Sequence, residues 1–188
     1  MARVSLLTRR AGATLEPERL MEMESLQELY VEELKDLWSA ERQILQALPR
    51  MIRAAGHREL KRAFTAHERQ TRQHVKRLER IFKALDASPR GKKCVGMEGL
   101  IKEGAELIQE KPEQDVLDAG LISAAQHVEH YEIAGYGTVR TWALLLGHEA
   151  QAALLQQTLD EDEEPDLLLT KLAESSVNLA AVDPVGAV

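Results

Sequence analysis

The segment Asp86–Gly96 reads DASPRGKKCVG, and it divides the chain into two halves that share the same helical plan. Proline and glycine residues in this segment break a helical pattern. The following stretch, Met97–Glu110, predicts one short helix that ends before Pro112. Because the connection is so long, the two halves can pack in an order that short loops would not permit. The helices on either side of it therefore decide the fold.

Each half contains two long stretches in which apolar residues recur at helical spacing. A glycine turn separates the two stretches, Gly56 in the first half and Gly147 in the second. Turns this short make the helices of each pair antiparallel neighbours. We expect Pro49 to bend the first helix and Pro165 to interrupt or kink the last. The predicted long helices cover residues 23–55, 58–85, 113–146 and 148–178.

Two antiparallel helical hairpins joined by a long crossover predict an all-α protein, a ferritin-like four-helix bundle with a short extra helix in the crossover. A length of 188 residues suits one domain with a sizeable core. We interpret residues 23–180 as the bundle, 1–22 as a loosely ordered N-terminal extension, and 181–188 as a C-terminal tail.

Charge and composition exclude several classes of function. A net charge of −7 disfavours nucleic acids and anionic membranes as partners, since both would repel the protein. No apolar run approaches the roughly 18 residues that a membrane span needs. The single Cys94 cannot form an internal disulfide, and the N-terminus lacks the apolar core of a signal peptide. We therefore expect a cytoplasmic protein.

Ionisable side chains interrupt the inward-facing apolar stripe of every long helix. On the last helix, one leucine stripe selects Glu161 as the inward residue, and a second stripe selects Asp162 instead. Asp162 with Asp166, and Glu161 with Glu164, are therefore competing pairs there. The candidate metal ligands are Glu41, His67, His74, Glu129, Glu132 and Glu161.

The candidates of the two hairpins lie at one level. In each hairpin they fall 15 residues from the glycine turn, at Glu41 and Thr71 in one and at Glu132 and Asp162 in the other. This spacing places them about 22 Å along the helices. Carboxylates that converge in an apolar core resist ionisation unless a cation holds them.

The ligand types narrow the choice of metal. Carboxylates mixed with imidazoles favour iron or manganese, with zinc less suitable. The i, i+3 pair of Glu129 and Glu132 can contact two ions together, which indicates a dinuclear centre. Such a centre would react with a small oxidant, peroxide or oxygen.

Four segments of the chain resemble one known family. They are LKDLWSAERQILQALPRMIRAA (34–55), KCVGMEGLIKEG (93–104), AAQHVEHYEIAGYGT (124–138) and LLQQTLDEDEE (154–164). Together they resemble the YciE/YciF family of ferritin-like bacterial stress-response proteins, over about residues 23–180. The resemblance implies a bundle related to rubrerythrin and manganese catalase, a homodimer and a role in stress. It supplies no established reaction.

The sequence departs from the usual di-iron pattern, in which two helices each carry a Glu-x-x-His pair. His67 is followed by Gln70, and Glu161 is followed by Glu164. His74 can replace Gln70 as a ligand. Because the set contains fewer charged ligands, it is compatible with one metal ion, a weakly held pair or none.

Three hypotheses for the function follow. The protein is a metal-dependent oxidoreductase that handles peroxide, or a metal-binding protein without turnover, or a metal-free helical scaffold that acts through a dimer surface.

Overall fold

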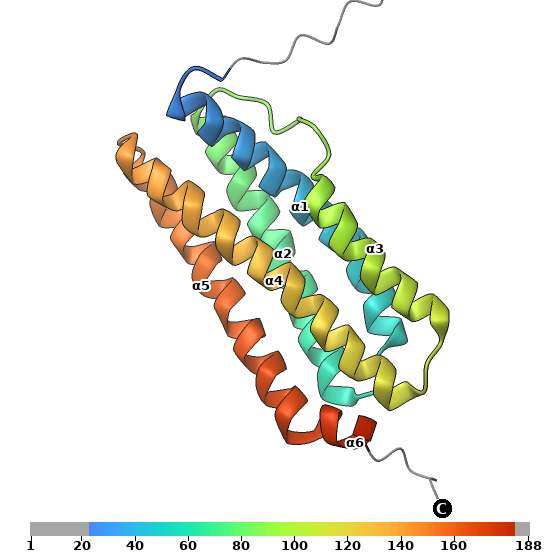
Figure 1. The fold of residues 1–188 in the computed structure, drawn as a ribbon. Coiled ribbons are helices and arrows are strands. Elements are labelled where there is room, and N and C mark those ends of the chain that lie inside the picture. Colours follow the sequence, from blue (N-terminus) through green and yellow to red (C-terminus); the bar gives the residue numbers. More distant parts are fainter. Residues whose placement is uncertain (1–22, 183–188) are drawn as a thin grey trace, which may run out of the picture.

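The structure of the protein is a computed structural model that describes residues 23–182, all of whose regular elements are helical (Figure 1). The all-α prediction is therefore confirmed for this part of the chain. The predicted extension over residues 1–22 lies outside the described residues, as do the last six residues of the predicted tail. The elements are α1 (Leu26–Ala54), α2 (Arg58–Ala84), α3 (Val95–Glu110), α4 (Gln114–Leu145), α5 (Glu149–Leu172), a π-helical turn (Ala173–Val177) and α6 (Asn178–Val182).

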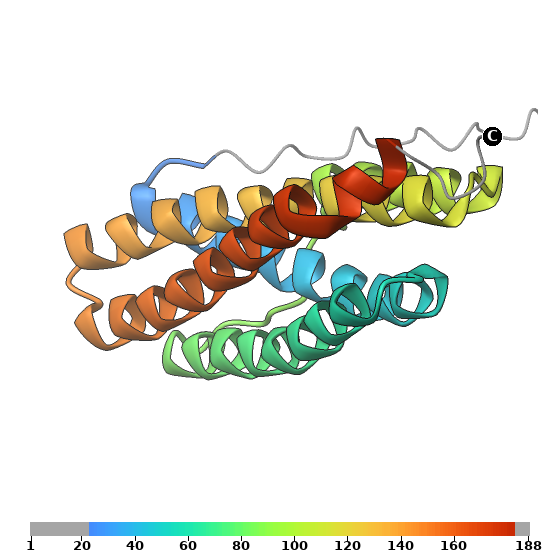
Figure 2. The ribbon, with the colours of Figure 1, turned by 90° about the horizontal axis from the view of Figure 1, so that it is seen from below.

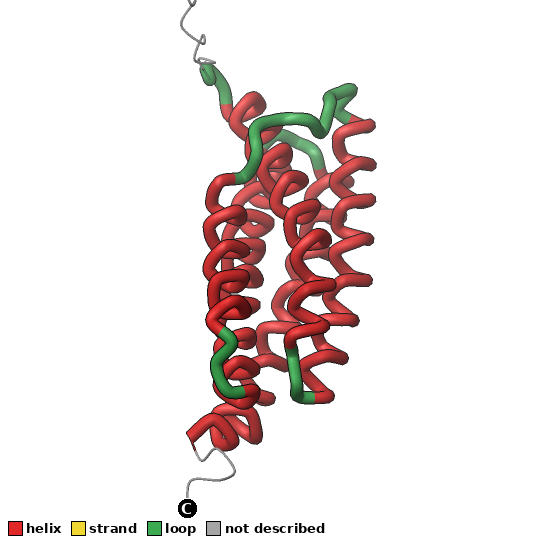
Figure 3. Tube along the Cα trace, turned by 90° about the vertical axis from the view of Figure 1, so that its right-hand side faces the viewer, coloured by secondary structure: helices red, strands yellow, loops and turns green. Residues whose placement is uncertain are grey.

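The four long helices pack side by side as two hairpins. Within the hairpins α1 contacts α2 and α4 contacts α5, and between them α1 contacts α4 and α2 contacts α5 (Figures 1 and 2). The short helix α3 lies outside this group, along α1 and α4. Most loop residues lie at the two ends of the helices (Figure 3), but the crossover loop also runs along α1, where the Cys94 amide donates to the Ser39 hydroxyl at 2.9 Å.

Local sequence signals explain where the helices begin and end. Ser25 forms a capping box at the start of α1, since its hydroxyl accepts from the Glu28 amide at 3.2 Å and the Glu28 carboxylate accepts from the Ser25 amide at 3.1 Å. Gly147, with φ of +75°, turns the chain between α4 and α5. Both α1 and α5 continue past Pro49 and Pro165. The last helix is thus not interrupted at its proline.

The apolar core of the described residues has two parts. One part lies toward the α1–α2 turn and includes Leu48, Leu60 and Leu121. The other lies toward the opposite end and includes Leu34 and Phe82. Buried ionisable residues lie between the two parts along each long helix. The core is therefore divided by a polar layer.

Asp118 joins the first hairpin to α4. Its side chain is 2 % exposed and accepts hydrogen bonds from the backbone amides of Gly56 (2.7 Å) and His57 (2.6 Å). These amides lie at the turn where α2 begins, so a carboxylate there also opposes the positive end of the helix dipole.

We predict that Asp118→Ala lowers the free energy of unfolding by about 3 kcal/mol, or the Tm by about 9 °C, because it removes the acceptor of two amides. Thermal unfolding followed by circular dichroism measures the change. Glu113→Ala is the control, since Glu113 lies in the turn before α4 and makes no side-chain capping bond. Equal effects of the two substitutions would contradict this role of Asp118.

Candidate metal centre

All four long helices contribute to the polar layer. Every residue in it is at most 5 % exposed. α1 supplies one residue, α2 three, α4 two and α5 one, and on α2 the two histidines are separated by seven residues, which places them on one face. The layer consists of Glu41, His67, Thr71, His74, Glu129, Glu132 and Asp162.

Two groups of possible ligands share one residue. Glu41, His74 and Glu132 form the first group, and His67, Glu129 and Glu132 form the second. In each group, one ligand atom from every residue lies within 4.8 Å of the others. Glu132 has two carboxylate oxygens and belongs to both groups, so it is placed to bridge two neighbouring ions.

The nitrogen and oxygen atoms that face one another are the ones that metals bind. Nδ1 of His67 lies 3.3 Å from Oε1 of Glu129, and Nδ1 of His74 lies 3.3 Å from Oε1 of Glu41. Oδ1 of Asp162 lies 3.5 Å from the same His74 nitrogen. Asp162 therefore adjoins the first group.

Many of these buried atoms have no hydrogen-bond partner among the described residues. Both oxygens of Glu132 and both of Asp162 are in this state, as are one oxygen each of Glu41 and Glu129 and the Nδ1 atoms of the two histidines. Buried polar atoms in folded proteins nearly always have a partner. Their concentration in one layer fits a site that is completed by cations.

Glu161 lies on the outer side of His74. Its side chain is 27 % exposed, and its two oxygens accept from the two terminal nitrogens of Arg77 at 2.6 and 2.7 Å. Nε2 of His74 is 3.1 Å from the same carboxylate. A carboxylate in this position orients a ligating imidazole and leaves Nδ1 to face the site.

The structure thus separates the sequence candidates. It brings together Glu41, His67, His74, Glu129 and Glu132, and it places Glu161 outside both groups. Asp162, which was the competing choice, is fully buried in the layer. The reason is helical phase, because the buried stripe of α5 runs through Leu155, Asp162 and Leu169 at intervals of seven residues. The stripe that selects Glu161 contains Leu168, which is 52 % exposed.

Two hydroxyl groups, one in the layer and one beside it, make hydrogen bonds to residues of the layer. The Tyr136 hydroxyl donates a hydrogen bond to Oε1 of Glu41. Thr71 donates to the carbonyl of His67 at 2.9 Å. Thr71 is three residues before His74, the position that a glutamate occupies in a Glu-x-x-His pair. His67, one turn earlier on α2, has a possible ligand atom close to Glu129 and Glu132.

Burial controls the ionisation of the layer. It raises the pKa of Glu129 to about 9, with further increases from Asp162 and Glu41, and it raises the pKa of Glu132 well above its usual range. Burial also raises the pKa of Asp162 to about 8, although His74 opposes this shift. These carboxyl groups therefore resist ionisation in the absence of a cation.

The two histidines shift in opposite directions. Burial, with a contribution from the charge of His74, lowers the pKa of His67 to about 3. For His74, burial lowers the pKa, but Glu41 and then Asp162 and Glu161 raise it more, to about 8. His67 is therefore neutral at physiological pH, whereas His74 would have to release a proton before its Nδ1 could bind a cation.

The charge of the layer matches two divalent ions. Its carboxyl groups, Glu41, Glu129, Glu132 and Asp162, carry four negative charges when they are ionised. Two divalent cations neutralise four carboxylates if both histidines are neutral. The layer is thus suited to a dinuclear site with mixed oxygen and nitrogen ligands.

The fold and the site define a class of protein, an all-helical bundle with a buried layer of carboxylates and imidazoles. The family described as Domain of unknown function (DUF892) matches residues 25–182, and the chain belongs to this family. It is 41 % identical to Protein YciF of Escherichia coli K12 over 162 residues, which are 86 % of this chain and 98 % of YciF. The predicted membership of the YciE/YciF family is confirmed.

Solved structures support the same assignment. The crystal structure of the E. coli stress protein YciF matches this chain with a TM-score of 0.80 at 41 % identity. The matched region covers 83 % of this chain and 99 % of YciF. YcfI of Rhodopseudomonas palustris has a TM-score of 0.77 at 39 % identity, and covers 80 % of this chain and 96 % of its own. Within residues 23–182, no helix is both long enough and apolar enough to cross a membrane.

We predict that the metal-free protein becomes less stable as the pH rises from 6.5 to 8. The folded pKa values of Glu129 and Asp162 lie above their ordinary values of 4.5 and 3.8. The unfolded chain therefore releases protons that the folded protein retains. His74 acts in the same direction above pH 6.5. His67, whose pKa is lowered on folding from 6.5 to about 3, acts in the opposite direction near pH 6.5, because the unfolded imidazole is still partly protonated there, but the carboxyl groups outweigh it. Each group with a raised pKa lowers the free energy of unfolding by up to about 1.4 kcal/mol per pH unit.

Urea unfolding in the presence of a chelator, at several pH values, measures this slope. Glu129→Gln should make the slope shallower, because the amide does not titrate. Glu164→Gln is the matched control, since Glu164 is exposed on α5 and should leave the slope unchanged. A stability that is constant or increases over this range would contradict the prediction.

Proposed function

We propose that the protein is a ferritin-like bundle that binds a pair of divalent metal ions, iron or manganese, and handles peroxide or oxygen during stress. The observation that carries the proposal is the pair of ligand groups that share Glu132. The unpartnered buried oxygens and the match of four carboxylates to two divalent ions support it further. The similarity to the E. coli stress protein YciF supports the role in stress.

The ligands divide between two positions. Glu41, His74 and Asp162 would hold one ion, and His67 and Glu129 the other, with Glu132 between them. When bound, a redox-active pair of this kind supplies electrons to, or accepts them from, a small oxygen species. Carboxylate and imidazole ligands favour iron or manganese over zinc for this purpose.

The surrounding residues orient the ligands. Arg77 holds Glu161 with two hydrogen bonds, and Glu161 in turn fixes the ring of His74. The Tyr136 hydroxyl donates to one oxygen of Glu41, which leaves Oε2 of Glu41 free. The burial of Tyr136, together with the charge of Glu41, raises its pKa well above the usual range, so it remains a proton donor. The apolar core on both sides excludes water from the layer.

We also propose that the protein is a homodimer. Several apolar side chains near the end of α5 and on α6 are exposed, and a second copy would bury them. They include Leu167 (59 %), Leu168 (52 %) and Leu179 (63 %).

We predict that protein purified without chelators binds about two iron or manganese ions per chain when titrated without oxygen. Glu132→Gln should reduce this number by at least one, because it removes a charge from both ligand groups. Metal analysis after gel filtration gives the ratio. Fewer than about 0.2 ions per chain in the unaltered protein, with no uptake of added metal, would leave the metal-free scaffold as the remaining hypothesis.

Two further variants separate ligands from orienting residues. Asp162→Asn should lower metal affinity more than Glu161→Gln, for which we expect a loss of about tenfold to a hundredfold. Glu164→Gln is again the matched control and should bind as the unaltered protein does. If Glu161→Gln abolished binding and Asp162→Asn did not, the assignment of these two residues would be reversed.

We predict that the metal-loaded protein consumes hydrogen peroxide or oxidises ferrous ions faster than Glu132→Ala does. The difference should be at least about tenfold, since the alanine variant lacks the shared ligand. Oxygen-electrode and absorbance measurements follow the two reactions. Equal rates in a protein that binds both ions would favour metal binding without turnover.

A further inference from the structure

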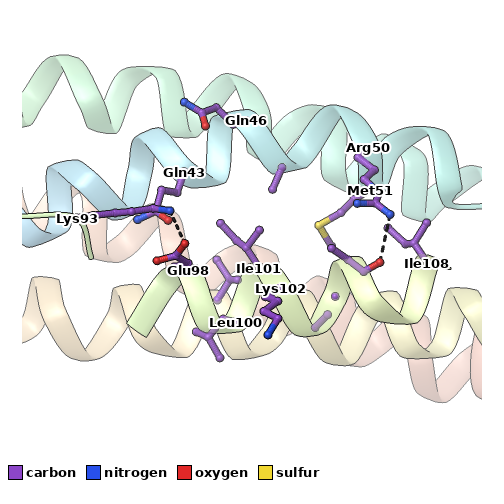
Figure 4. Close-up of a pocket in the computed structure, with 15 residues that line it drawn as sticks. Gln43, Gln46, Arg50, Met51, Lys93, Glu98, Leu100, Ile101, Lys102 and Ile108 are labelled. Carbon is purple, nitrogen blue, oxygen red and sulfur yellow. Dashed lines mark hydrogen bonds and ion pairs between the residues drawn. The ribbon is translucent and has the colours of Figure 1, made fainter. Parts of the chain in front are cut away.

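A pocket of about 420 Å³ lies between α1 and α3 (Figure 4). It extends along two turns of α1, from Gln43 to Arg50, with α3 on the facing side and α4 behind. Its volume is in the range of pockets that bind small organic molecules. Most of the wall is apolar, and includes Ala47, Met51, Ile101, Ile108 and Val128.

A second cavity lies on the side of the pocket that faces the candidate metal centre. This smaller cavity of about 30 Å³ shares Ala47, Met51, Ile101 and Val128 with the pocket. The smaller cavity also reaches His67 and Glu129, the ligands of the second group. Both side chains are at least nine-tenths buried, and each has an atom without a hydrogen-bond partner among the described residues. The smaller cavity thus lies between the pocket and one end of the polar layer, and the four shared side chains line both spaces.

The rim of the pocket carries an available positive charge. Three cations line it, and two of them face carboxylates, since Lys93 lies 2.5 Å from Glu98 and Lys102 lies 3.7 Å from Glu106. Arg50 makes no ion pair within residues 23–182, and its guanidinium donates one hydrogen bond there, to the Ala105 carbonyl at 3.2 Å. Figure 4 shows Arg50 at one end of the pocket, next to Met51 and Ile108. A guanidinium in this state offers its remaining donors to a carboxylate.

We infer that the pocket between α1 and α3 binds a small amphipathic carboxylate, with its head group on Arg50 and its unbranched apolar tail directed through Ala47 and Met51 toward His67 and Glu129. The identity of this molecule as a substrate of the metal centre rests on the proposed function. The binding of the carboxylate does not rest on the proposed function, because every residue that would contact this molecule is present in the metal-free chain.

Two properties of the pocket select this chemistry. The apolar wall favours a hydrocarbon tail, whose affinity rises about fourfold for each methylene group that is removed from water. Arg50 favours an anionic head group over a neutral or cationic one. Both ends of the ligand must therefore match the pocket.

Calorimetric titration of the full-length protein with octanoate tests the inference. We expect saturable binding that strengthens from hexanoate to octanoate by about fifteenfold for the two added methylenes. Octanol and octylamine should bind at least about tenfold more weakly than octanoate, because neither presents a carboxylate to Arg50. Arg50→Gln should weaken octanoate binding by at least about tenfold. Arg53→Gln, an exposed arginine outside the pocket lining on the same helix, is the matched control and should bind octanoate normally.

A second measurement tests whether the hydrocarbon tail of the bound carboxylate lies near His67. The ring signals of His67 in the NMR spectrum, assigned by their loss in His67→Gln, should shift more with octanoate than with hexanoate. Ala47→Leu should reduce this shift, because Ala47 lines both spaces and a larger side chain leaves less room for the tail. No binding of octanoate, equal binding of octylamine, or no effect of Arg50→Gln would each overturn the inference. Metal content is measured on the same samples. If the protein binds octanoate but takes up no metal, only the proposed function is contradicted. If the protein takes up its full metal content but does not bind octanoate, only this inference is contradicted.

Discussion

The burial of four carboxyl groups in one layer of an apolar core is the constraint on which the rest of the structure depends. Glu41, Glu129, Glu132 and Asp162 come from three different helices and meet with two histidines from a fourth. Transferring such groups from water without partners costs several kcal/mol for each. The core can contain them only as protonated acids or as ligands of cations. The raised pKa of Glu132 is what protonated acids in the core would show. The two groups of possible ligands that share Glu132 are what cation binding would require.

The remainder of the fold holds this layer in place. Apolar clusters lie on both sides of it along the helices and exclude water. Asp118 secures the turn of the first hairpin against α4, so that the histidines of α2 remain at the level of Glu129 and Glu132. On the outer side, Arg77 and Glu161 hold His74 in one orientation. The short helix α3 covers the face of α1 and α4 and forms one wall of the pocket between α1 and α3.

Most of the fold and much of the site follow from the sequence. The apolar spacing around Gly56 and Gly147 predicts the four long helices, and the inward stripe of α4 predicts that Glu129 and Glu132 are buried, whereas His127 and His130 are exposed. The choice between Glu161 and Asp162 could not be made in this way, because two leucine stripes overlap on α5 and packing against α2 selects one. Leu155 and Leu169, seven residues on either side of Asp162, were the available signal.

Features that depend on contacts between distant segments could not be predicted. The pairing of Arg77 with Glu161 joins residues 84 positions apart, and no periodicity along one helix indicates it. The pocket forms because α3 returns along α1, and the short crossover helix does not itself reveal which face it covers. Sequence periodicity fixes the phase of each helix, whereas the packing of α3 and the orientation of long polar side chains are tertiary effects.

Anomalous X-ray diffraction from crystals loaded with manganese or iron tests the central claim most directly. The account predicts two peaks about 3.5–4 Å apart, the spacing of two-metal sites, with Glu132 bridging them and His67 and His74 on opposite sides. A single peak, or peaks only at exposed acids on the helix surfaces, in a crystal whose polar layer is otherwise unchanged, would contradict it.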